Sequence, residues 1–181
     1  KLGDVCEIVV GGTPSTINKE YWNGDIGWLS SGDINNSNVT QPSKLITELG
    51  LKNSSAKIMP INTILLAMTG ATLGRIGFLK FECSGNQSIA GFIPNNTFYS
   101  KFLFYCLQYG INQIFKYAGG AAQRGINKQS IFNLKYRFPC IEEQNKVANF
   151  ISAIDKKIDL VSNQLENTKV FKKGLLQQMF V

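Results

Sequence analysis

Amide and guanidinium side chains in segments rich in small residues are the groups best suited to chemistry in this 181-residue sequence. Gln123 and Arg124 are neighbours in the small-residue segment 119–125. A glutamine can pair with N6 and N7 of adenine, and an arginine with O6 and N7 of guanine, so these two side chains are suited to reading bases. Asn86 and Gln87 form a second amide pair with the same kinds of donor and acceptor.

Hydroxyl groups and a further arginine in two other small-residue segments are weaker candidates for contacts to phosphate. Thr13 and Ser15 follow a Gly-Gly pair, and Thr69, Thr72 and Arg75 alternate with glycines. Glycine lets a backbone approach a ligand closely, and hydroxyl and guanidinium groups donate to phosphate oxygens. Taken singly, each of these residues is more typical of a cap or a turn, and an arginine is at least as typical of a surface salt bridge. Only the whole set, together with the charge of the chain, favours a nucleic acid.

The residue patterns of common catalytic and metal sites are missing. The sequence has no histidine, so triads and acid–base pairs built on histidine are excluded. Residues 70–75 do not match a phosphate-binding P-loop, and residues 11–15 lack the G-x-G-x-x-G pattern of dinucleotide-binding loops. The cysteines lie far apart and form no CxxC pair, so neither zinc nor another metal is expected; they are Cys6, Cys83, Cys106 and Cys140. We therefore predict no catalytic residue and no cofactor bound by this chain.

Composition and charge fit a globular protein with a polyanionic partner. Hydrophobic residues make up 44% of the sequence and charged residues 17%. Lysine and arginine outnumber aspartate and glutamate by 19 to 12, which gives a formal net charge of +7. A basic balance permits binding to nucleic acid or to another anionic surface. Nothing resembles a signal peptide and no apolar run is long enough to cross a membrane, so we expect reduced thiols and a cytoplasmic location.

Residues 1–139 are predicted to form an α/β domain of the α+β type, with mixed short strands and a few helices. Turn residues separate several short apolar runs, which predict strands within residues 2–10, 20–29, 63–68, 76–79, 89–94 and 134–138. Residues 31–44 are rich in Gly, Asn, Ser and Pro and predict a long surface loop.

Residues 98–117 are predicted to form one helix. An aromatic stripe at helical spacing favours packing in the core over a platform for stacking bases; its members are Phe98, Phe102, Tyr105, Cys106 and Tyr109.

Residues 140–181 predict a long helix that pairs with another helix. Alternating spacings of four and three residues pick out ten positions from Val147 to Met179, and only Thr168 and Lys172 among them are polar. The apolar positions are Val147, Ile151, Ile154, Ile158, Val161, Leu165, Leu175 and Met179. Such a helix would be about 55–60 Å long, whereas a domain of this size is some 30 Å across. We therefore expect the helix to project and to need a partner; the alternative is a helix folded back onto its own domain.

Several segments, taken in their order along the chain, are similar to segments of a known protein family. They are Leu2-Gly3-Asp4, residues 11–15, 21–28, 31–33, 64–66 and 70–74, Asn86-Gln87, residues 123–126, Pro139, Glu142-Glu143-Gln144, residues 154–158 and residues 174–180. In this combination the sequence resembles the specificity subunit of type I restriction–modification systems. The Gly-Gly-Thr-Pro-Ser to Tyr-Trp stretch and the Glu-Gln to Ile-Asp helix are specific only when they occur together.

The resemblance implies a division of labour. Each specificity subunit of that family has two target-recognition domains, each followed by a conserved helix, and the two helices pair antiparallel and set the distance between two half-sites. Modification subunits methylate adenine with S-adenosylmethionine, restriction subunits use ATP to translocate and cut, and the recognition domain is not catalytic. On this basis residues 1–139 are the recognition domain and residues 140–181 the pairing helix.

One departure from the family pattern leaves two arrangements open. This chain has one domain and one helix, so it is either half of a longer subunit or a half-length subunit that dimerises. A symmetric dimer would read a site with two-fold symmetry. An alternative function is a protein-interaction module that acts through its helix, which the helix pattern alone permits.

Overall fold

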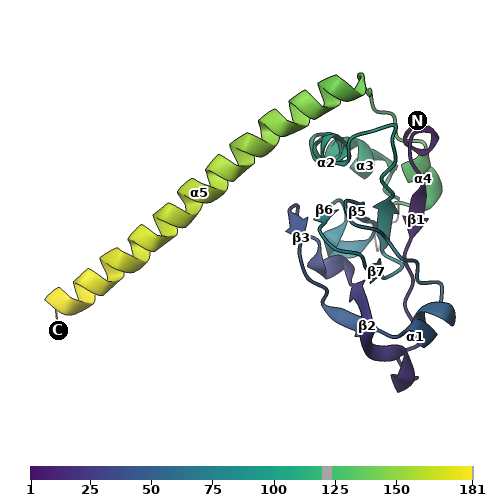
Figure 1. The fold of residues 1–181 in the computed structure, drawn as a ribbon, viewed down its shortest axis with the longest axis horizontal. Helices are drawn as coiled ribbons and strands as arrows, with labels where there is room; N and C mark the ends of the chain where they lie inside the picture. Colours follow the sequence, from purple (N-terminus) through teal and green to yellow (C-terminus); the bar gives the residue numbers. More distant parts are fainter. Residues whose placement is uncertain (120–123, 181) are drawn as a thin grey trace.

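The computed structural model describes residues 1–119 and 124–180, in which two small sheets and a layer of helices precede one projecting helix (Figure 1). The five-stranded sheet has the order β1-β8-β5-β6-β3 and the three-stranded sheet the order β4-β2-β7. The strands are β1 (Ile8–Val10), β2 (Trp22–Leu29), β3 (Asn38–Val39), β4 (Lys44–Ile46), β5 (Ile64–Ala67), β6 (Ile76–Leu79), β7 (Ser84–Gly85) and β8 (Ile89–Phe92). The α-helices are α1 (Glu48–Lys52), α2 (Ser100–Tyr109), α3 (Ile111–Tyr117), α4 (Lys128–Phe132) and α5 (Ile141–Met179). Short 3-10 helices are η1 (Leu2–Asp4), η2 (Lys19–Tyr21), η3 (Ser31–Asp33) and η4 (Gly70–Thr72).

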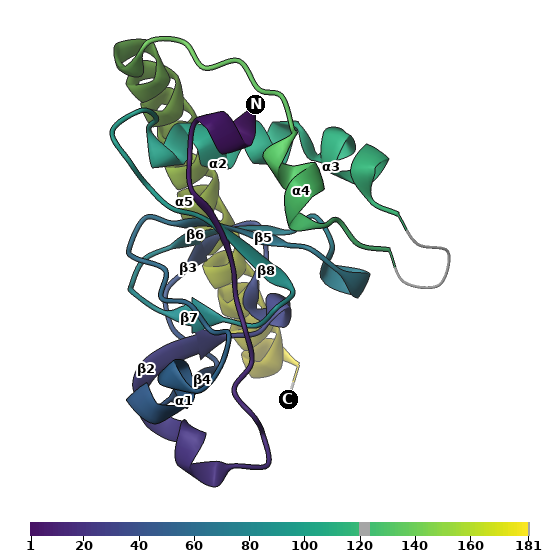
Figure 2. The ribbon, with the colours of Figure 1, turned by 90° about the vertical axis from the view of Figure 1, so that its right-hand side faces the viewer.

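The five-stranded sheet is buried on both faces, which explains its continuous apolar strands. Alternate residues of a strand point to opposite faces. Ile64 and Leu66 of β5 accordingly join the core under α2, α3 and α4, while Leu65 and Ala67 join a second core on the other face. Figure 2 shows the helices on one side of this sheet and β2, β4 and α1 on the other. The predicted α+β architecture is confirmed, as are the strands at residues 64–67, 76–79 and 89–92.

The prediction of a single helix over residues 98–117 is wrong, because the helix breaks at Gly110 into α2 and α3. A Cβ on Gly110 would lie 2.6 Å from the ring of Tyr136, so any residue other than glycine at this position would displace that ring. The break also changes the stripe: Phe98 and Phe102 are buried, but Tyr109 is 94% exposed.

Three other local predictions need correction. Residues 134–138 form no strand, although their burial alternates with Leu134 buried and Lys135 and Arg137 exposed. Residues 20–29 contain the end of η2 and the single strand β2, whose pairing with β4 is irregular, instead of short strands around a glycine turn. The predicted loop at residues 31–44 contains η3 and the edge strand β3.

The helix α5 has 39 residues and extends well beyond the domain, as the sequence predicts (Figure 1). At 1.5 Å per residue it is about 58 Å long. Glu142 and Glu143 lie in its first turn, where the helix dipole favours carboxylates. Within the described ranges, the helices are all too short or too polar to span a lipid bilayer.

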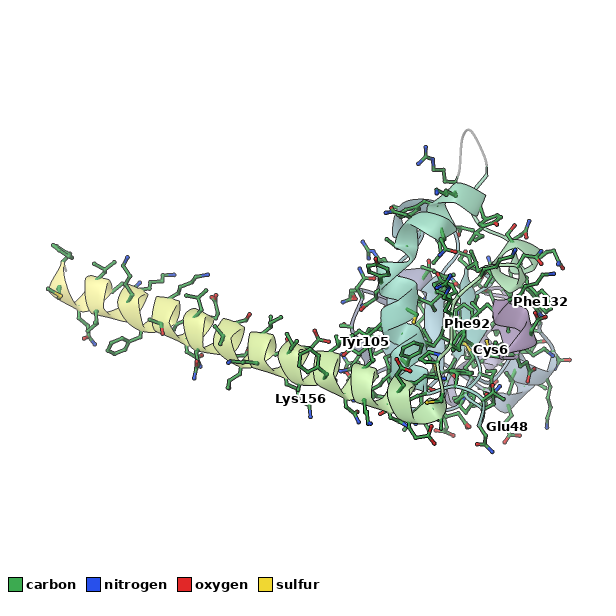
Figure 3. The ribbon with its side chains drawn as sticks, turned by 90° about the horizontal axis from the view of Figure 1, so that it is seen from above. Cys6, Glu48, Phe92, Tyr105, Phe132 and Lys156 are labelled. Atoms are coloured by element: carbon green, nitrogen blue, oxygen red, sulfur yellow. The ribbon has the colours of Figure 1, made fainter. Side chains whose placement is uncertain are left out.

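Only the first turns of α5 pack on the domain, and they do so against α2. Ala148 is fully buried, and Gln144 is buried with both ends of its amide in use. The Gln144 Oε1 accepts from the Tyr99 backbone N–H at 2.9 Å, and its Nε2 donates to the Pro139 carbonyl at 2.9 Å. Two turns beyond Ala148, the Tyr105 hydroxyl donates to Asp155 Oδ2 at 2.6 Å. Figure 3 shows Tyr105 next to the domain end of α5. These contacts fix the direction in which the helix leaves the domain.

Replacing Gln144 by leucine should lower the free energy of unfolding by about 1–3 kcal/mol, because the N–H of Tyr99 and the carbonyl of Pro139, both half-buried, would lose their partner. Gln164, which is exposed on the free part of α5, is the matched control, and its leucine variant should unfold like the parent. Urea denaturation followed by tryptophan fluorescence measures both. Equal stability of the two variants would contradict the anchoring role of Gln144.

Candidate nucleic-acid interface and helix seam

Antiparallel pairing brings three of the polar loops to one end of the five-stranded sheet. Strands β1 and β5 end there, and β6 and β8 begin there, since Val10 pairs with Ala90, Ala67 with Ile89 and Leu66 with Ile76. The fourth segment runs beside the end of β5, where the Ile126 N–H donates to the Met68 carbonyl at 2.9 Å. We call these segments, residues 11–15, 69–75, 85–88 and 124–126, the loop edge.

Hydrogen bonds link predicted site residues that are far apart in the sequence. The Thr13 hydroxyl donates to Gln87 Oε1 at 2.6 Å, across 74 residues. The Thr69 hydroxyl donates to the Ser88 hydroxyl at 2.8 Å. Next to Thr69, the Gly70 N–H donates to the carbonyl of Arg124 at 3.0 Å. The loop edge is therefore one connected surface.

The Gly-Gly pair at positions 11 and 12 is required by close backbone packing. The Gly12 N–H donates to the Gly85 carbonyl at 2.8 Å, and the Gly11 N–H to the Ile89 carbonyl at 3.0 Å. A Cβ on Gly11 would lie 2.2 Å from the Gly85 oxygen, so even alanine would push the two segments apart. The Trp28 indole N–H donates to the Gly12 carbonyl at 3.0 Å and so fixes the loop to β2.

Several predicted contact residues have hydrogen-bonding groups that the fold already uses. Asn86 Oδ1 accepts from the Ser88 backbone N–H at 3.1 Å, which shapes the turn before β8. The Thr72 hydroxyl donates to the Thr69 carbonyl at 3.2 Å inside its own turn. Asn86, Thr69 and Thr72 thus build the loops, whereas the exposed residues Thr13 and Gln87 face outward from them. The role of Ser88 was missed, because only the folded chain shows that Thr69 bonds to it.

The remaining predicted contacts differ in their exposure. Ser15 is exposed, and its carbonyl accepts from the Trp22 indole. Arg75 is half-buried beside α3, and its Nη1 donates to the Ile34 carbonyl over a long 3.4 Å. Arg124 is exposed, while Gln123 lies outside the described residues.

The charge of the loop edge is positive. Arg75 and Arg124 belong to it, and Lys116 and Lys128 flank its last segment in the sequence. Residues 11–15, 69–75, 85–88 and 124–126 include no aspartate or glutamate. An edge with cations, amides and hydroxyls but no carboxylate suits a polyanion that carries hydrogen-bonding groups.

The predicted pairing positions of α5 form a seam on a face of the helix that the domain leaves open. Seven of the eight apolar positions are exposed, from 39% for Val147 to 71% for Met179, and Ile151 is half-buried. Gln144, Ala148 and Asp155, which face α2, lie about a quarter turn away from the seam at 100° per residue. The seam therefore stays largely exposed when α5 docks on its own domain.

Three of the four thiols are poor nucleophiles, because they are buried or half-buried. Burial raises the pKa of Cys6 and of Cys83 to about 12 and that of Cys106 to about 11, so all three are protonated at neutral pH. Glu82 adds to the shift of Cys83 by its negative charge. Across residues 1–119 and 124–180, no three Cys, Asp or Glu side chains come together where they could hold a metal ion.

Comparisons with known proteins agree on one group. Residues 1–169 match the family model described as the type I restriction modification DNA specificity domain. The MjaIX specificity subunit of a type I restriction enzyme from Methanocaldococcus jannaschii is 30% identical over 182 residues, which cover 98% of this chain and 41% of that protein. The EcoR124I/EcoR124II specificity subunit from Escherichia coli is 26% identical, over 91% of this chain and 42% of that protein. The chain thus spans about two fifths of the length of these relatives.

Solved structures share the fold. A chain from a structure that describes complex assembly and conformational transition of the type I R-M system superposes with a TM-score of 0.74 at 18% identity, over 97% of this chain and 42% of that one. The HsdS subunit from Thermoanaerobacter tengcongensis gives a TM-score of 0.67 at 18% identity, over 90% and 38%.

Placing two charges in the seam should abolish association through α5 without unfolding the domain. We expect the Ile154→Asp/Ile158→Asp variant to sediment as a monomer, because each aspartate would lose its hydration against an apolar partner surface. The Asn163→Asp/Asn167→Asp variant adds the same charge on the opposite side of the helix and should associate like the parent. Sedimentation velocity measures the masses; identical masses for all three proteins would contradict the seam.

Proposed function

The chain belongs to the family of type I restriction modification DNA specificity domains, and on that premise we propose that it recognises a short sequence in double-stranded DNA through its loop edge. The observation that carries the proposal is the gathering of the polar loops at one end of the sheet, with exposed Gln87 and Arg124 among them. Amide and guanidinium groups supply base contacts, and neighbouring hydroxyls and cations supply phosphate contacts that set the register.

In this proposal the helix α5 does not read sequence. It fixes the position of the domain relative to a second recognition unit, which packs on the seam. That second unit is either the other half of a longer subunit or a second copy of this chain. The chain spans about two fifths of the length of these relatives, and each arrangement would supply a second recognition unit.

The chemistry belongs to partner subunits. We propose that modification subunits methylate adenine with S-adenosylmethionine and that restriction subunits use ATP to translocate and cleave DNA. The chain itself supplies specificity and no catalytic group. Such a complex works where the chromosome is, in the cytoplasm of a bacterial or archaeal cell.

A protein-interaction module is the second candidate function, and the exposed seam favours it. In that case a partner protein would bind α5 with the same affinity in the presence or absence of DNA. Substitutions in the loop edge would also leave that affinity unchanged. DNA recognition predicts instead that the loop edge matters for the assembled complex on DNA.

Selection from a random pool of duplexes tests the proposed function. The chain, assembled with its modification subunits, should enrich one short sequence or an inverted pair of it. Affinity for the enriched duplex should fall steeply as salt rises, because each phosphate contact releases counterions. No enrichment and no duplex affinity at low salt would contradict the proposal.

The Arg124→Ala variant refines the same experiment. If Arg124 reads a guanine, preference at one base pair should weaken by about 1–3 kcal/mol while the other positions keep theirs. Arg137→Ala is the matched control, because Arg137 is also exposed but lies in the segment between α4 and α5. Equal preferences in both variants would contradict a base contact by Arg124, and a uniform loss in Arg124→Ala would make it a phosphate contact.

A further inference from the structure

We propose that Gln87 reads a base as a hydrogen-bond donor, and that Thr13 sets this polarity by holding the acceptor oxygen of the Gln87 amide toward itself. The inference rests on the proposed function and specifies which base edge the loop edge recognises. It starts from the 2.6 Å bond in which the Thr13 hydroxyl donates to Gln87 Oε1.

A free glutamine side chain has no fixed preference among bases. Its amide has two N–H donors on Nε2 and two lone pairs on Oε1. Pairing with adenine uses one of each, since Oε1 accepts from N6 and Nε2 donates to N7. The Thr13 hydroxyl takes one of these lone pairs and holds Oε1 toward Thr13, whereas both N–H groups of Nε2 remain available. Among the hydrogen bonds within the described residues, Nε2 makes none.

The backbone around the pair is held on both sides. Gly11 and Gly12 are bonded to the Ile89 and Gly85 carbonyls, which locks the segment before Thr13 against the turn that carries Gln87. The turn itself is closed by the Ile89 N–H, which donates to the Asn86 carbonyl at 3.1 Å. Thr13 and Gln87 are therefore presented in a fixed relation before any ligand binds, and a preorganised contact loses little entropy on binding.

The Asn86 amide is less suited than the Gln87 amide to contact a base. Asn86 Oδ1 accepts the Ser88 backbone N–H, so its side chain is committed to the turn. Gln87 is exposed, while Asn86 is half-buried. The two residues look equivalent in the sequence, but the structure separates a turn-forming amide from an outward-facing one.

The donor polarity selects a base edge. In the major groove guanine presents two neighbouring acceptors, O6 and N7, which match the two N–H groups of Nε2. Cytosine presents the N4 amino donor there, which the free N–H groups would oppose. We infer that the base opposite Gln87 is guanine, in place of the adenine that an unconstrained glutamine pairs with.

Variants at positions 87 and 13 test the inference by selection of duplexes, with preferences compared position by position. Gln87→Glu keeps an oxygen for the Thr13 hydroxyl but has no N–H donor, so preference for guanine should fall about ten-fold or more at one position and shift toward cytosine. Gln87→Met, which adds no charge, should lose the preference at that position alone. Thr13→Val frees Oε1 and should shift the preference from guanine toward adenine, whereas Thr13→Ser should keep the parent preference.

Gln41→Glu is the matched control, because Gln41 is exposed and follows β3, whose pairing with β6 puts its end at the opposite end of the sheet. It should retain the parent preferences at every position. Unchanged preferences in Gln87→Glu and Gln87→Met would overturn the inference, as would a change spread uniformly over all positions. Absence of enrichment by the parent chain would instead contradict the proposed function, so the two failures are distinguishable.

Discussion

The antiparallel register of β1, β8, β5 and β6 is the constraint on which the rest of the structure depends. Each pairing in this series reverses the chain direction, so two strands end and two begin at the same end of the sheet. Loops that are separated by more than 70 residues in the sequence therefore share one surface, and Thr13 can bond to Gln87. A shift of one residue in the register of β8 would exchange the side chains between its two buried faces and displace these loops relative to each other.

Two faces of α5 have different roles: one docks on the domain, and the other carries the seam. Gln144, Ala148 and Asp155 fasten its first turns to α2, and this fixes the direction of the helix relative to the loop edge. The seam lies about a quarter turn away and stays uncovered along the projecting part. A partner helix on the seam would thus be held at a defined angle to the recognition surface. Specificity and spacing can then be supplied by different parts of the same chain.

Sequence patterns predicted the elements that depend on local periodicity. The long helix follows from its heptad spacing, and β5, β6 and β8 follow from short apolar runs between turns. The need for glycine at position 110, where the helix breaks, was not predictable in this way, because the ring of Tyr136 that crowds it lies 26 positions further along the chain. Residues 134–138 have the alternation of a strand but no partner strand.

The candidate site was predictable as a set of residues but not as an arrangement. Residue chemistry singled out Thr13, Gln87 and Arg124, yet nothing in the sequence indicates that Thr13 bonds to Gln87 or that Asn86 closes a turn. The docking face of α5 was also missed, because polar residues such as Gln144 look like a solvated face until their buried partners are known.

Hydrogen–deuterium exchange with and without a selected duplex shows directly whether DNA binds at one end of the five-stranded sheet. We expect slower exchange of the backbone amides in residues 69–75 and 85–89 when DNA is bound, and unchanged exchange in residues 60–63 and 93–97 at the opposite end. Protection of residues 60–63 and 93–97, with no change in residues 69–75 and 85–89, would contradict it.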